Sequence, residues 1–173
     1  ILLEDIHHEG SVSLYQATVK SITAGGVVTV TSSVCNGMLQ SASSVDCHDS
    51  QILKIDAAEK AKIARCYVTE SIDCGGGVEI DAHKSDLQSL KGDSVTVKNA
   101  RRIQELKCAT VLFEGATLGS GDVSEKGTFV DAHVLESVGG TASHLELIRS
   151  DAKRLIFRKP YFIPGSESSV VIK

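Results

Sequence analysis

Large aromatic side chains are scarce in this chain of 173 residues. Tryptophan is absent, methionine occurs once, and aromatic residues make up 4% of the sequence. The apolar fraction of 42% is ordinary for a globular protein, so the apolar residues are mostly valine, isoleucine, leucine and alanine. Such a set suits a narrow, regularly layered interior better than a sandwich built around aromatic anchors. The length predicts one domain with a sizeable core, spanning residues 1–173.

Three kinds of segment are also missing. No basic stripe with interleaved aromatics is present and the formal net charge is −4, so we expect no nucleic-acid partner. No apolar run approaches the ~20 residues that a membrane-spanning helix needs. No signal peptide is present, and the sequence begins abruptly at Ile1. Because a leader could have been trimmed, its absence decides nothing: we expect a cytoplasmic protein, with export and a leader absent from this sequence as the alternative.

Cysteine occurs five times, and no two cysteines form a Cys-x-x-Cys pair (Cys35, Cys47, Cys66, Cys74, Cys108). The sequence therefore indicates neither a zinc knuckle nor a redox motif. We expect buried free thiols in a reducing compartment, and the alternative is one or two disulfides in an exported protein.

Motifs of familiar catalysis are absent. The chain has no Gly-x-Ser-x-Gly, no Walker loop and no Rossmann fingerprint in the required context, so we predict no catalytic residue and no cofactor. Carboxylates are plentiful, but the sequence alone pairs none of them. Polysaccharide cleavage therefore stays open as an alternative, and the question of enzymatic activity stays open with it.

An internal repeat is the strongest feature that is present. Four segments carry two apolar residues in alternation, with a small residue three positions later, and they begin 41, 42 and 50 residues apart. The segments are Val12-Ser13-Leu14 with Ala17, Leu53-Lys54-Ile55 with Ala58, Val95-Thr96-Val97 with Ala100, and Leu145-Glu146-Leu147 with Ser150. A repeat of about 42 residues fits two coils of a β-solenoid, each of ~20 residues. The units are 5–45, 46–80, 81–130 and 131–173.

Apolar residues between 94 and 118 recur at spacings of two and three. A strand alternates at two, and each corner inserts one extra residue. The predicted inward-facing residues are Val95, Val97, Ala100, Ile103, Leu106, Cys108, Val111, Phe113, Ala116 and Leu118. We therefore predict a mainly β fold, a parallel β-helix of roughly eight short coils. The alternatives are a strand–helix repeat, with short helices over 56–65, 100–106 and 151–157, and a β-barrel or sandwich.

The stretch from Ala109 to Leu118 resembles parallel β-helices, in particular bactofilin-type solenoids. The likeness covers about 25 residues, from Ser94, and rests on valine-rich texture and the turn Gly115-Ala116. It implies a β-solenoid with polymer-forming activity. The chain departs from that family in its cysteines, its uneven repeat lengths and its lack of regular Gly-Asp punctuation.

An Asp-x-His triplet recurs four times and contains four of the six histidines (Asp5-Ile6-His7, Asp46-Cys47-His48, Asp81-Ala82-His83, Asp131-Ala132-His133). Residues i and i+2 of a strand share a face, so the aspartate and histidine of a triplet point outward together while apolar neighbours face the core. We interpret the triplets as a solvent-exposed face that closes each repeat before a turn.

Metal binding is the sharper hypothesis for the triplets, because carboxylate and imidazole are natural metal ligands. The candidates are Asp46, His48, Asp81, His83, Asp131 and His133. Triplets two coils apart are ~10 Å apart, whereas two histidines on one zinc need their nitrogens within ~4 Å. The spacing therefore argues against a shared ion, and we predict no metal. A pH-sensitive ladder of histidines that charge together in acid is a further hypothesis.

The ends of a solenoid expose unpaired strand edges, which must be capped or used. Tyr161, Phe162 and Ile163 lie between two prolines, which cannot donate to a ladder, and these three are the interface candidates. We predict a non-catalytic structural or protein-interaction scaffold that forms a homo-oligomer or binds a protein partner. A carbohydrate-binding or polysaccharide-cleaving β-helix is the alternative, so carbohydrate remains a candidate partner.

Overall fold

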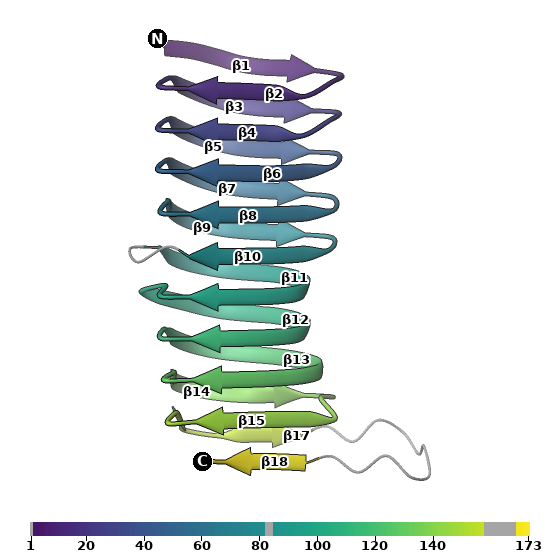
Figure 1. Ribbon diagram of the computed structural model, residues 1–173, viewed down its shortest axis with the longest axis vertical. Coiled ribbons are helices and arrows are strands. Elements are labelled where there is room, and N and C mark those ends of the chain that lie inside the picture. Colours follow the sequence, from purple (N-terminus) through teal and green to yellow (C-terminus); the bar gives the residue numbers. More distant parts are fainter. Residues whose placement is uncertain (1, 82–84, 158–168) are drawn as a thin grey trace.

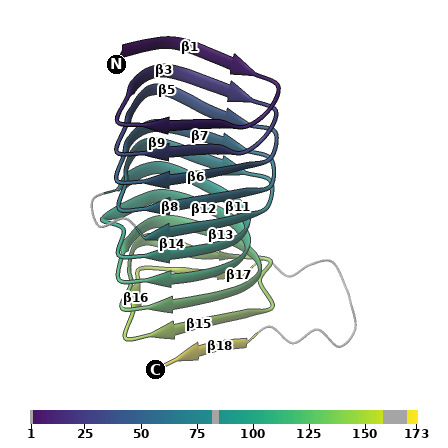
Figure 2. The same cartoon turned by 45° about the horizontal axis from the view of Figure 1, so that its top comes forward.

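The chain is a parallel β-solenoid of about nine coils, described from a computed structural model (Figure 1). The structure describes residues 2–81, 85–157 and 169–173. The coils stack along one axis, and the two ends of the chain lie at opposite ends of the stack (Figures 1 and 2). The predicted fold class is confirmed. None of the described residues is helical.

Each coil contributes to two faces, on which neighbouring strands are parallel. The first face holds β1 (Leu2–His8), β3 (Thr18–Ala24), β5 (Val34–Ser41), β7 (Gln51–Ala57), β9 (Tyr67–Cys74), the first parts of β11 (Asp86–Lys98), β12 (Arg102–Glu114) and β13 (Thr117–Val130), then β14 (His133–Gly140), β16 (Asp151–Ala152) and β17 (Leu155–Phe157). The second face holds β2 (Val12–Tyr15), β4 (Val28–Thr31), β6 (Ser44–His48), β8 (Lys60–Ala64), β10 (Gly77–Asp81), the second parts of β11 to β13, β15 (His144–Ile148) and β18 (Ser169–Ile172).

One coil advances the chain by 15 to 18 residues, as measured between partners on neighbouring strands from β1 to β17. The step from β15 to β18 is longer, at 25 residues. The coil is therefore shorter than the predicted ~20 residues, which is why about nine coils form where roughly eight were expected.

The predicted unit of about 42 residues does not correspond to whole coils. Val12, Val95 and Leu145 occupy one column, five and three coils apart. Leu53 lies in β7 on the other face, outside that column. Three of the four segments are thus single copies of a pattern that recurs once in every coil.

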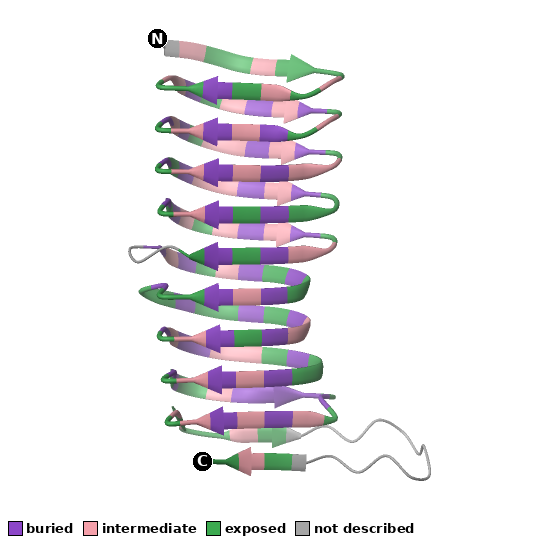
Figure 3. Cartoon of the chain, in the orientation of Figure 1, coloured by how far each residue is buried: buried purple, intermediate pink, exposed green. Residues whose placement is uncertain are grey.

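The core is one continuous cluster of apolar residues inside the coils, and buried positions recur along the strands of every coil between more exposed ones (Figure 3). All ten inward-facing residues predicted between Val95 and Leu118 are buried. In β8, Ala61 and Ile63 point inward and Lys60 and Lys62 outward. This alternation by two explains why 56–65 contains the end of β7, a corner and β8, and not the alternative helix. The stretches 100–106 and 151–157 likewise enter β12, β16 and β17.

A residue with a left-handed backbone turns the chain from the second face to the first. These residues form one column of Gln16, Ser32, Asp49, Arg65, Asn99, Gly115, Asp131 and Arg149, with φ between 47° and 63°. Each donates its backbone N–H to a carbonyl of the next coil, as Asp49 does to Ala64 at 3.1 Å. The stacked coils therefore supply a hydrogen bond that holds an otherwise unfavourable conformation.

A small residue follows each left-handed residue and fills the inside of the corner. Where that residue is serine, its hydroxyl bonds the backbone of this crowded turn. Ser33 Oγ accepts from the N–H of Ala17 at 3.1 Å and donates to the carbonyl of Thr31 at 2.8 Å, and Ser50 Oγ accepts from the N–H of Ser33 at 3.1 Å. This satisfies polar groups that burial would otherwise leave unpaired.

Candidate functional site

The corner that leads from the first face to the second is shorter in two consecutive coils. Six residue steps separate the flanking inward residues in the coil from Ile72 to Val78, whereas five steps separate Leu90 from Val95. The next coil, from Leu106 to Val111, also has five. In these two coils β11 and β12 continue unbroken around the corner (Figure 1). One missing residue in each coil therefore leaves the corner recessed between longer neighbours.

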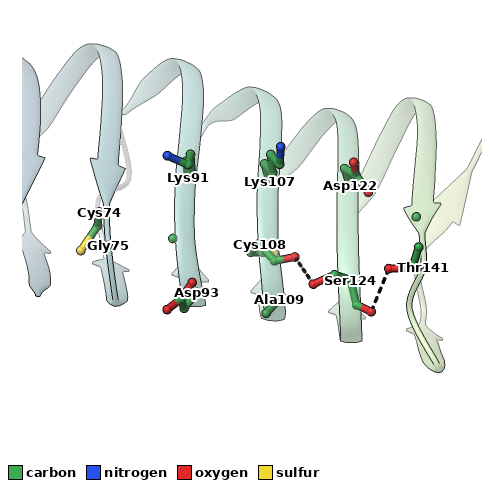
Figure 4. A pocket seen from close by; sticks show the side chains of 12 residues that line it. Cys74, Gly75, Lys91, Asp93, Lys107, Cys108, Ala109, Asp122, Ser124 and Thr141 are labelled. Carbon is green, nitrogen blue, oxygen red and sulfur yellow. Dashed lines mark hydrogen bonds between the residues drawn. The ribbon is translucent and has the colours of Figure 1, made fainter. Parts of the chain in front are cut away.

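The recess is an open groove of about 450 Å³ that crosses several coils (Figure 4). Lys91, Lys107 and Asp122 line one side and are partners in register on β11, β12 and β13. Lys91 Nζ donates to the two carboxylate oxygens of Asp73, one coil earlier, at 3.0 and 3.3 Å. The column thus reads acid, base, base, acid, so the flanking carboxylates offset the repulsion between neighbouring lysines.

The hydroxyls of the groove bond to the protein backbone. Ser124 Oγ donates to the carbonyl of Cys108 at 3.5 Å, and Thr141 Oγ1 donates to the carbonyl of Ser124 at 3.2 Å (Figure 4). A hydroxyl nucleophile needs an adjacent general base. No such base bonds either hydroxyl among the residues that the structure describes, so the groove lacks this arrangement.

The thiols beside the groove are poor nucleophiles. Burial raises the pKa of Cys74, and it raises the pKa of Cys108 to about 12. The pKa of Cys66, deeper in the stack, is raised to about 11 by the same cause. Because the thiolate is the reactive form, the raised pKa lowers the reactivity of these thiols at neutral pH. All five cysteines are free and buried, which confirms the expectation of buried free thiols.

A second, smaller depression of about 150 Å³ lies on the first face around Tyr67. Val34, Gln51 and Tyr67 are successive partners in register on β5, β7 and β9. Tyr67 is 40% exposed, and Asn36, Gln51 and Thr69 line the depression beside its ring. These side chains bear uncharged donors and acceptors. No carboxylate lines this depression and no tyrosine lines the corner groove, so neither cavity combines the two features that polysaccharide cleavage would favour.

The Asp-x-His triplet on β6 has the predicted orientation. Val45 and Cys47 are buried, while Asp46 and His48 point outward. Asp46 Oδ1 lies 2.8 Å from His48 Nε2, but the two atoms are not aligned as a hydrogen bond, and Oδ1 has no such partner among the described atoms. The pair is therefore a close contact on the outer surface that becomes an ion pair when His48 is protonated.

The other triplets occupy different places in the coil. Asp81 ends β10 in the column of His48, not of Asp46, and His83 lies outside the described residues. Asp131 is a left-handed corner residue, so the chain turns before His133 begins β14. The prediction of four equivalent triplets is therefore wrong, because the triplets are not separated by whole numbers of coils.

The triplet histidines that the structure describes consequently do not form a ladder. His7 is in register with Thr23 on the first face, His48 with Thr31 on the second, and His133 with Thr117 on the first. His133 Nδ1 contacts the carboxylate of Asp151 one coil later. No group of three or more His, Cys, Asp or Glu side chains that could hold a metal ion occurs among the described residues.

The ends of the solenoid leave core positions uncovered. Val170 and Ile172 in β18 are partners of Leu145 and Leu147, which are buried, so they point to the same interior side. They are nevertheless 41% and 71% exposed. That these two exposed side chains stand at core positions becomes visible only once the strand register is known.

The predicted interface residues Tyr161, Phe162 and Ile163 lie outside the described residues. Within the described part of the chain, no helix is long and apolar enough to cross a membrane. Comparisons with protein-family models, with curated proteins and with solved structures find no match to this chain.

Proposed function

We propose that this chain is a non-catalytic structural scaffold that self-associates through the ends of its solenoid. The exposure of Ile172 carries the proposal, because this side chain occupies a core position in register with buried Leu147. Exposed strand edges and exposed apolar surface both favour association with another chain. The resemblance to bactofilin-type solenoids is consistent with this role.

Light scattering coupled to size exclusion tests this proposal over a range of protein concentrations. We expect the mass of the wild-type chain to rise with concentration, and the double variant Val170→Asp/Ile172→Asp to remain monomeric. Leu112→Asp is the matched control, since Leu112 is 37% exposed on β12, in the middle of the stack. A wild-type chain that stays monomeric at every concentration would refute the proposal.

Binding of a neutral carbohydrate is a second candidate function, and the depression around Tyr67 favours it. An exposed aromatic ring offers an apolar face, and the neighbouring amides and hydroxyl offer hydrogen bonds without charge, which together suit a sugar ring. The corner groove, by contrast, is lined by charged side chains.

Saturation-transfer NMR with maltotriose and cellotriose tests this second function. We expect transfer to at least one of them, lost in Tyr67→Ala and reduced in Gln51→Ala. Tyr15→Ala is the control, because Tyr15 is 68% exposed and does not line the depression. Equal transfer in Tyr67→Ala and wild type would exclude this site.

A further inference from the structure

The inward residues of the two ends have the same spacing on the first face. At the last coil, Ala152 and Leu155 pair with Val134 and Val138, which are buried. Both therefore point inward, three positions apart, and both are only partly covered.

The first coil repeats this spacing. Leu3 and Ile6 pair with the fully buried Val19 and Ile22, so they also point inward, three positions apart and only partly covered. The columns continue in one line, since Leu155 stands in the column that begins with Ile6. A last coil laid against a first coil therefore places Ala152 beside Leu3 and Leu155 beside Ile6.

The second face matches in the same register. Val12 and Leu14 of β2 head the columns that end with Val170 and Ile172 of β18. The same stacking therefore covers the exposed side chain of Ile172 with that of Leu14.

Opposite charges lie between these apolar pairs. The first coil has Glu4 and Asp5 between Leu3 and Ile6, and the last coil has Lys153 and Arg154 at the equivalent positions. All four charged residues are exposed. Asp5 already accepts a hydrogen bond from Lys20 of the following coil at 3.0 Å. A basic side chain stacked on the other side of Asp5 would therefore extend an existing column of opposite charges.

The described residues of the two end coils are also complementary in charge. Residues 2–16 contain three carboxylates and no lysine or arginine, a formal charge of −3. Residues 151–157 and 169–173 contain three cations and one carboxylate, a formal charge of +2. Contact between two first coils or between two last coils would instead bring like charges together.

We propose that the last coil of one copy stacks on the first coil of a second copy, parallel and in the register of the solenoid itself. The proposal rests on the proposed self-association and names its partner, its polarity and its contacts. A head-to-tail contact of this kind does not close on itself, so it generates linear chains of copies and not a closed dimer.

Charge reversal at one end at a time tests this joint. The first variant carries Lys153→Glu with Arg154→Glu, and the second carries Glu4→Lys with Asp5→Lys. We expect each variant alone to dissociate, with the apparent dissociation constant raised roughly 100-fold in sedimentation velocity, because like charges now meet. An equimolar mixture restores association, since every reversed end then meets an end of opposite sign.

The control is Lys62→Glu with Arg101→Glu, the same change of charge on exposed residues in the middle of the stack. We expect it to associate like the wild type. Restored association in the mixture also rules out misfolding as the cause of dissociation.

The outcomes separate the two proposals. A wild-type chain that never associates overturns both the scaffold function and this joint. A wild-type chain that associates, while either reversed variant alone does so equally well or their mixture stays dissociated, overturns only the head-to-tail joint.

Discussion

Arg149 donates two hydrogen bonds, of 2.7 and 2.6 Å, to the carboxylate of Asp131, and both residues have a left-handed backbone. The same relationship joins Arg65 to Asp49, with both bonds at 2.7 Å. The stacked left-handed corner residues are thus held together in two ways. Backbone hydrogen bonds join the coils, and paired side chains join them again on the outer surface.

Because the corner residues have a left-handed backbone, we expect glycine at a corner to stabilise the fold. Ser32 is exposed, has a φ of 49°, and its side chain makes no hydrogen bond that the structure describes. Left-handed backbone costs a non-glycine residue ~1–2 kcal/mol, of which the greater chain entropy of glycine offsets part. We expect Ser32→Gly to raise the free energy of unfolding in urea by about 0.5–1 kcal/mol.

Ser13→Gly is the matched control, because Ser13 is an exposed residue of strand β2. We expect this substitution to lower the free energy of unfolding. If both glycine variants are destabilised alike, the left-handed corner does not carry the strain that we assign to it.

The paired corner residues predict a loss of stability in acid. Hydrogen bonds from Arg65 and Arg149 lower the pKa of Asp49 and of Asp131. A carboxyl group with a lowered pKa stabilises the fold above its unfolded pKa of ~3.9, and that contribution is lost as the pH falls through the folded pKa.

We therefore expect the free energy of unfolding to fall below about pH 4, and to fall less steeply in Asp131→Asn. Asp93→Asn serves as the comparison, since Asp93 has no ion pair among the described residues. Urea titrations at pH 7, 4 and 3 measure the slopes. Identical slopes in Asp131→Asn and wild type would contradict this assignment.

Two neighbouring glycines are predicted to differ sharply in their tolerance of a methyl group. A Cβ on Gly75 would stand 2.3 Å from the carbonyl oxygen of Ala58, whereas the nearest atom to a Cβ on Gly77 is 3.9 Å away. We expect Gly75→Ala to cost ~1–3 kcal/mol and Gly77→Ala to change stability by less than about 0.5 kcal/mol. Thermal and urea unfolding of both variants decide this, and an equal cost for the two would show that the coils adjust freely here.

The buried thiols are expected to be unreactive in the folded protein. Burial raises the pKa of Cys66 to about 11 and that of Cys108 to about 12. We expect iodoacetamide at pH 8 to label none of the five cysteines in native protein and all five in 8 M urea, as counted by mass spectrometry. Rapid labelling of Cys108 in native protein would mean that the corner groove opens around it.

The sequence predicted the local geometry well because each inward residue is fixed by alternation within its own coil. Val95 to Leu118 contains spacings of two and three, and every residue predicted to be inward there is buried. The burial of the cysteines was predictable on another ground, because no two of them form a Cys-x-x-Cys pair.

Relationships between coils were not predictable. The left-handed positions include Gln16, Ser32, Arg65 and Gly115, so no single residue type marks the coil period. Two coils after Asp46 its column holds Glu79, so Asp81 looks equivalent in sequence but lies in the column of His48. The groove arises from missing residues, which leave no motif to find.

Hydrogen exchange at the two edge strands tests the central claim most directly. Backbone amides of β1 and β18 are measured by mass spectrometry at low and high concentrations of wild-type protein, with β6 and β12 as internal references. The account predicts that protection of β1 and β18 rises together with concentration, while the references stay equally protected. Exchange of both edge strands at one unchanging rate across that range would contradict it.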